Sequence, residues 1–115
     1  MRVTSEMFVS LIIRRCFSDG GAAVVEHKGA SEAGAVYFRA VHRDRTQSLY
    51  VPAPQLFFES EEAKHDRLFE KRYSSVAEFE ISEKLAQELS FDSDIWIVEL
   101  EADNPETYFK TISVD

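Results

Sequence analysis

The first segment of the chain is a nearly continuous apolar run with a narrow polar stripe. Its pattern predicts a helix over residues 5–18, with Thr4 or Ser5 able to cap the first amides and Gly20-Gly21 as the stop. A helix this apolar must be covered on more than one side, either inside the monomer or in a subunit interface. The polar stripe consists of Glu6, Ser10 and Arg14, spaced four residues apart.

Three strands are predicted next, over residues 22–28, 35–43 and 48–53. A tight turn at Asp44-Arg45 would pair the second strand with the third, placing Phe38 opposite Val51. It would also place Arg39 opposite Tyr50. In this register Val36, Phe38 and Ala40 share the core face with Leu49 and Val51, whereas Tyr37, Arg39, Val41 and Tyr50 point the other way.

The middle of the chain is less regular. Residues 55–74 carry no clear period, and residues 59–67 form a polar excursion. A second helix is predicted from Ser75, where Ser75 and Glu78 fit a capping box. A competing two-residue period allows it to begin only at Ser82. Its apolar face would consist of Ala77, Ile81, Leu85 and Leu89.

Two further strands are predicted over residues 95–101 and 108–114. The first is apolar on both faces at its start, which is typical of a central strand. The order of elements is therefore α-β-β-β-α-β-β. We expect a single α+β domain over residues 1–115, with a mostly antiparallel sheet of about five strands and two packed helices.

Charge is divided unequally along the chain. Residues 1–56 have a formal charge of +2 and residues 57–115 a formal charge of −10, which together give the net −8. An acidic second half would repel phosphates, so the sequence argues against nucleic acid as a partner. No apolar run is long enough to span a bilayer, and Cys16 is the only cysteine. These features predict a reduced, cytoplasmic protein.

Carboxylates crowd around one predicted strand. Asp92 and Asp94 precede it, and Glu99 and Glu101 lie on one of its faces. Oxygen-rich groups of this kind can hold Mg²⁺ or Mn²⁺, and together with Glu6 the two aspartates are candidate catalytic residues. The simpler interpretation is a loop and a solvated strand end, so we expect no metal and no cofactor.

The order α-β-β-β-α-β also matches the core of the restriction-endonuclease-like nucleases. Such nucleases need an acidic residue on one strand and Glu-x-Lys on the next. Here Glu26-His27-Lys28 falls on the first strand, and the third strand has no acid. A metal-dependent hydrolase or nuclease-like domain therefore remains only an alternative.

A third possibility rests on Tyr37, Arg39 and Tyr50. On one exposed sheet face these side chains would form a stacking and cation–π patch for a small molecule. A helix packed on that face would bury it instead.

Histidine and cysteine give weaker indications. His27, His42 and His65 lie on different segments, without the short spacing of a zinc motif. Cys16 falls on the apolar side of the first helix, which favours a buried, inert thiol over a nucleophile.

Several short motifs occur in a fixed order along the chain. They are Arg2-x-Thr4-Ser5-Glu6, Gly34-x-Val36, Pro52-Ala53-Pro54-Gln55, Arg67-Leu68-Phe69 and Phe91-Asp92-x-Asp94-x-Trp96. Together they resemble a family of small uncharacterised alphaproteobacterial proteins, classed as a domain of unknown function. The resemblance spans roughly residues 2–101 and implies a bacterial, cytoplasmic, single-domain protein. It implies no activity, cofactor or catalytic residue.

The preferred hypothesis is a non-enzymatic protein-interaction module that associates with itself or with another protein. It rests on the apolar first helix and on the lack of an assembled catalytic constellation. The metal-dependent hydrolase and the small-molecule binding domain stay as alternatives.

Overall fold

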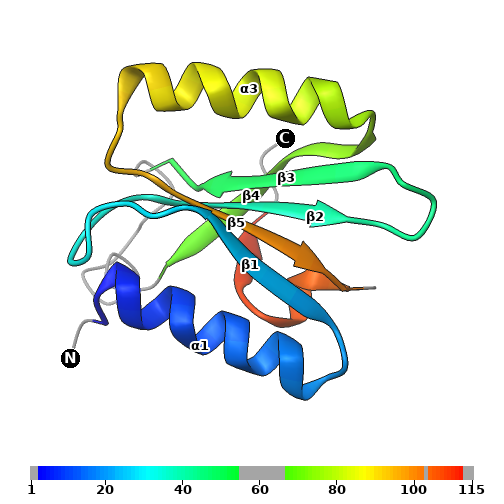
Figure 1. Cartoon of the computed structure of the whole chain (residues 1–115), viewed down its shortest axis with the longest axis horizontal. Coiled ribbons are helices and arrows are strands. Elements are labelled where there is room, and N and C mark those ends of the chain that lie inside the picture. The colour runs from blue at the N-terminus through cyan, green and yellow to red at the C-terminus, as the bar shows by residue number, and fades with distance from the viewer. Residues whose placement is uncertain (1–2, 55–66, 103, 113–115) are drawn as a thin grey trace.

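A mixed sheet lies between two helices, one on each face (Figure 1). The computed structural model describes residues 3–54, 67–102 and 104–112. It confirms an α+β fold with two helices packed on one sheet. The elements are α1 (Ser5–Ser18), β1 (Ala22–His27), β2 (Val36–Val41), β3 (Gln47–Pro52), β4 (Leu68–Val76), α3 (Glu78–Phe91), β5 (Trp96–Glu101), the 3-10 turn η2 (Pro105–Thr107) and β6 (Lys110–Ile112).

The sheet has six strands in the order β1-β5-β2-β3-β4-β6. β5 pairs antiparallel with β1 but parallel with β2, and β6 is parallel to β4. The β2–β3 and β3–β4 pairs are antiparallel. The sheet therefore has one strand more than expected, and β5 is inserted between β1 and β2.

The ends of α1 lie where the sequence predicts them. The Thr4 hydroxyl accepts a hydrogen bond from the Met7 amide and caps the first turn. Backbone carbonyls of Ser31 and Glu32 accept from the amides of Glu6 and Ser5, so the loop before β2 caps the same end. At the other end the chain turns at Gly20, whose φ is +86°.

The predicted β2–β3 register was wrong by one residue. Phe38 pairs with Tyr50, and Arg39 pairs with Leu49. The reason is a wider turn than expected, in which the His42 amide bonds to the Thr46 carbonyl. A shift of one residue moves every side chain to the other face. Tyr50 therefore lies on the α1 side of the sheet.

A strand, β4, occupies part of the region predicted to be irregular; residues 55–66 of that region lie outside the described residues. The predicted capping box was also wrong. Ser75 has a left-handed φ of +52°, and its amide donates to the Ser48 hydroxyl. Helix α3 begins at Glu78 after Ala77, between the two predicted starts.

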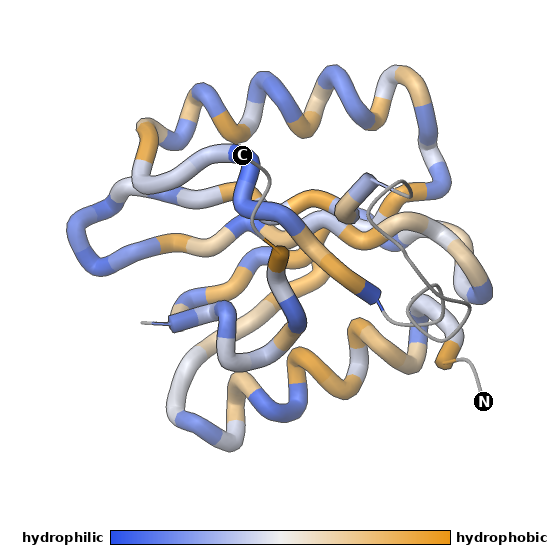
Figure 2. The backbone as a smooth tube through the Cα atoms, turned by 180° about the vertical axis from the view of Figure 1, so that it is seen from behind, coloured by the Kyte–Doolittle hydropathy of each residue, from blue (hydrophilic) through white to orange (hydrophobic). Residues whose placement is uncertain are grey.

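Two apolar cores result, one on each face of the sheet. The core under α1 holds Val9, Ile12 and Cys16 with a cluster of aromatic rings. The core under α3 includes Ile81 and Leu85, as the predicted helix face requires. Figure 2 shows the longer apolar run in α1 and the more regular alternation in α3. Within the described part of the chain, no helix is long and apolar enough to cross a membrane.

Candidate functional site

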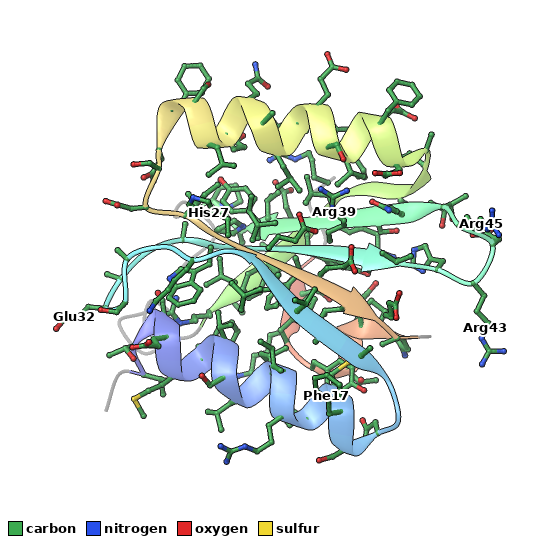
Figure 3. All side chains as sticks on the ribbon, viewed as in Figure 1. Phe17, His27, Glu32, Arg39, Arg43 and Arg45 are labelled. Atoms are coloured by element: carbon green, nitrogen blue, oxygen red, sulfur yellow. The ribbon has the colours of Figure 1, made fainter. Side chains whose placement is uncertain are left out.

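The most elaborate polar cluster surrounds Arg39, between the sheet and α3 (Figure 3). Only 8% of Arg39 is exposed. Its Nε lies 2.9 Å from Glu26 Oε1, and its Nη2 donates to Glu26 Oε2 at 3.3 Å. Nη1 donates to Gln47 Oε1 at 3.1 Å and to Ser82 Oγ at 2.9 Å. The guanidinium thereby ties β1, β2, β3 and α3 together.

Glu26 lies at an irregularity in β1. The pairing of β1 with β5 shifts between Val25 and His27, which leaves Glu26 as the extra residue. A bulge of this kind re-aims a side chain and is common beside functional sites. The His27 ring secures the end of the bulge, with Nδ1 2.8 Å from the Ile95 carbonyl oxygen.

Glu99 adds negative charge to the same place. In the strand register it lies opposite Arg39 on one side and Val24 on the other. Burial raises the pKa of Glu99, and the nearby carboxylates of Glu26 and Glu101 raise it further, while Arg39 opposes them. The surface beside Arg39 is therefore acidic, because Arg39 is already paired with Glu26 and does not balance Glu99 and Glu101 as well.

The cluster is an internal ion pair supported by neutral hydrogen bonds. Glu26 and Arg39 bind each other, and Gln47 and Ser82 supply only neutral contacts to the guanidinium. Across residues 3–54, 67–102 and 104–112, no three His, Cys, Asp or Glu side chains gather in an arrangement that could hold a metal ion.

The predicted patch of Tyr37, Arg39 and Tyr50 is not formed, because the register shift places Tyr50 on the opposite face. Tyr50 is 1% exposed and donates a hydrogen bond to Glu106 at 2.8 Å. Tyr37 is partly buried beneath α3, where it bonds to Glu88 at 3.2 Å. Burial and the Glu88 carboxylate raise the pKa of Tyr37 to about 12.

The predicted carboxylate group is likewise spread out. Asp92 and Asp94 precede β5, and the Asp92 carboxylate accepts from the Asp94 amide at 2.9 Å in a local turn. Glu101 lies at the far end of the strand, roughly 20 Å from Asp94. The four acids cannot share one ion, because the Asp92–Asp94 turn and the Glu99–Glu101 pair lie at different ends of β5.

The other two acidic residues considered, Glu6 and Glu26, lie on opposite faces of the sheet, beside different helices. Glu6, on α1, lies 3.8 Å from the Lys28 ammonium group in an exposed ion pair. Glu26 instead binds Arg39 beneath α3. The Glu26-His27-Lys28 motif therefore does not converge on one point.

Cys16 is fully buried, as its position in the sequence predicts. The His42 ring lies 2.8 Å from the Ser48 hydroxyl, at the far end of β2 from His27. His27 therefore contacts a backbone carbonyl and His42 a side chain in another part of the sheet, and His65 lies outside the described residues.

A polar groove of about 560 Å³ opens where β2 and β5 end. Carboxyl ends of parallel strands are common positions for ligands in α/β sheets. Tyr108 closes one side of the groove by donating to Asp19 at 2.8 Å. Sequence reasoning missed this groove because it depends on the insertion of β5 beside β2. Its other lining residues include His42, Arg43, Glu101 and Asn104.

Comparison with known proteins places this architecture in a family. The family model described as "Protein of unknown function (DUF1491)" matches residues 3–110. The chain belongs to the DUF1491 family. The sequence-based resemblance to a domain of unknown function is thereby confirmed. No curated protein is similar enough to count as a match.

Solved DUF1491-like structures share the fold. Protein Atu0922 from A. tumefaciens has 46% sequence identity and a TM-score of 0.86, with 100% of this chain and 98% of that chain covered. A DUF1491 family protein from Caulobacter crescentus has 26% identity in its crystal structure, with a TM-score of 0.77 and coverage of 97% and 100%. The NMR structure of a DUF1491 family protein from the same organism gives 27% identity, a TM-score of 0.79 and coverage of 98% and 99%.

Proposed function

We propose that this member of a family of unknown function is a non-enzymatic protein-interaction domain that associates with itself through α1. The observation that carries the proposal is the solvent side of α1, where Met7 is 55% and Leu11 47% exposed. The two side chains are four residues apart and therefore adjacent on the helix. An exposed apolar pair on a helix that is already anchored by its other side favours a helical interface.

A second copy of the chain is the partner that the charges of α1 favour. Glu6 lies near the start of the helix and Arg14 near its end, both exposed. Two copies of α1 packed antiparallel about a two-fold axis would place Glu6 of each copy near Arg14 of the other. Met7, Ser10 and Leu11 would then meet in the middle of the interface.

The non-enzymatic part of the proposal is supported by the use of the polar groups. Arg39 and Glu26 bind each other, and the acids around β5 are spread along the strand. A metal-dependent hydrolase would need several carboxylates at one point. The buried Cys16 is in keeping with a reducing, cytoplasmic location.

The test is sedimentation velocity over a concentration series, comparing the parent protein with the double variant Met7→Ser/Leu11→Ser. We expect a concentration-dependent dimer in the parent and at least a tenfold weaker dimer in the variant. Phe79→Ser/Phe91→Ser is the matched control, because it removes two exposed apolar side chains from the other helix. A parent that stays monomeric at every concentration would overturn the proposal, as would equal weakening by both double variants.

A further inference from the structure

Among the described residues, the outer edge of β1 is the least protected part of the sheet. β1 is one end of the strand order, and at the other end β6 is only three residues long. The four residues from Ala22 to Val25 carry no charge and no proline. Edge strands usually carry a charged residue, a proline or a bulge that prevents pairing with another chain. In β1 the bulge comes only at Glu26, and no strand in the described part of the chain pairs with the outer edge of Ala22–Val25.

On the α3 side, this edge is acidic around one apolar side chain. Val24 is 53% exposed, because α3 packs chiefly over β3 and β4. Glu99 lies directly behind Val24, and Glu101 lies opposite Ala22 on the same face. Glu26 completes this acidic side. The nearby Arg39 is buried and already bound to Glu26, so it cannot neutralise all three carboxylates.

On the α1 side, the same edge is apolar. The Glu6–Lys28 ion pair shows which flank of α1 faces β1. Ile13 is seven residues from Glu6 and Phe17 four residues further, so both lie on that flank. Ile13 packs at the margin of the core with Ala23 and Val25, whereas Phe17 is 56% exposed. Figure 3 labels Phe17 at the end of α1, below β1.

We propose that the β1 edge binds an extended segment of a different protein whose side chains alternate between basic and apolar. Side chains of an added strand point alternately to the two faces of the sheet. Its Lys or Arg residues would face Glu26, Glu99 and Glu101, and its apolar residues would face Ile13 and Phe17. This surface is separate from the exposed pair on α1.

A second copy of β1 fits this edge poorly. If the second copy paired with its α3 side next to the α3 side of the first, its β1 would place Ala22, Val24 and Glu26 on the acidic side. It would add carboxylates to the three that are already there and would bring no cation. Charge complementarity therefore selects a basic partner strand over self-pairing.

The first test uses a capped peptide of seven residues that alternates lysine and valine. Backbone amides of β1 that point outward exchange with solvent until an added strand protects them. Hydrogen exchange followed by NMR should show at least tenfold protection at alternate residues between Ala22 and Val25 when the peptide is bound. The control is a peptide of the same composition with its lysines and valines in separate blocks, which should not protect β1.

The second test separates a specific site from general attraction to an acidic protein. Glu99→Gln/Glu101→Gln should weaken binding of the alternating peptide about tenfold. Glu80→Gln/Glu83→Gln makes the same charge change on the exposed side of α3 and should have little effect. Equal weakening by both pairs, binding without protection of β1, or equal binding of the block peptide would each overturn the proposal.

Discussion

Arg39 and Glu26 form an ion pair although the strands that carry them are not neighbours in the sheet. Arg39 lies on β2 and Glu26 on β1, and β5 runs between these two strands. Even so, Arg39 Nε is 2.9 Å from Glu26 Oε1, because the long arginine side chain reaches across β5 to the glutamate on β1. The pair links the open edge of the sheet to its centre, beside the surface proposed to receive a partner strand.

Replacement of this arginine should be costly. Arg39→Met leaves Glu26 without its cation and leaves Gln47 and Ser82 without a shared donor. The arginine side chain is 10% exposed and the glutamate side chain 29%, so the pair is only partly shielded from water. We expect a loss of about 2 kcal/mol in the free energy of unfolding, measured by urea denaturation.

A double-mutant cycle isolates the contribution of the pair. Once Arg39 has been replaced, Glu26→Gln should cost much less than it costs in the parent, giving a coupling of about 1 kcal/mol or more. Additive effects of the two substitutions would show that the ion pair contributes nothing to stability.

The pKa of Glu106 predicts a stability that depends on pH. The Lys71 ammonium group holds this pKa below its usual range, and the hydroxyl of Tyr50 lowers it further. A lowered pKa in the folded state stabilises the protein when the pH is above the ordinary value of 4.5, and this stabilisation is lost as the pH falls below it. Glu106→Gln should therefore cost about 1 kcal/mol near neutral pH and progressively less below pH 4.5.

Urea unfolding at several pH values would check this difference. Glu83→Gln on α3 serves as a control for the change in net charge and should differ little from the parent at any pH. A deficit of Glu106→Gln that stays constant down to strongly acidic pH would contradict the assignment.

Two glycines should respond differently to alanine. A Cβ at Gly34 would lie 2.3 Å from the Asp94 carbonyl oxygen, so Gly34→Ala must displace backbone and should cost about 3 kcal/mol. At Gly20 a Cβ would meet nothing within 4 Å, but the φ of +86° is strained for alanine, and we expect about 1 kcal/mol. Thermal unfolding of both variants gives the comparison. Equal costs would mean that the loop before β2 yields to the added methyl group.

Cys16 should be inert until the protein unfolds. Burial raises the pKa of its thiol, and the charges of Asp19 and Glu101 raise it further. Reaction with a chromogenic disulfide reagent should be slow for the native protein and complete in denaturant. Ser18→Cys places an exposed thiol on the same helix and should react rapidly. Rapid modification of native Cys16 would reveal opening of α1.

The sequence was most informative where local signals agree with the packing. The cap at Thr4 and the turn at Gly20 predict both ends of α1, and the apolar spacing of α3 predicts its buried residues Ile81 and Leu85. The strands at Ala22 and Trp96 were also expected within one residue of their observed starts.

The remainder depends on contacts that no local pattern encodes. In β4 the charged run from Glu70 to Arg72 interrupts the alternation of apolar and polar residues that would indicate a strand. The structure accommodates these charges because Glu70 binds Arg72 and Lys71 binds Glu106 of η2. The β2–β3 register depended on one extra residue in a turn, and that residue moved Tyr50 to the other face. The cluster around Arg39 could not be predicted, since it depends on the insertion of β5 between β1 and β2.

The position of β5 also has a consequence for how the chain folds. β1 has no hydrogen-bonded neighbour until β5 arrives, yet more than sixty residues separate the two in sequence. During synthesis, α1 and the first four strands therefore emerge before the strand that joins β1 to the rest. Pairing between such distant segments closes a long loop and slows folding. A nascent chain that stops at the end of α3 should be open to proteolysis at β1, and release of β5 should protect β1 in one cooperative step.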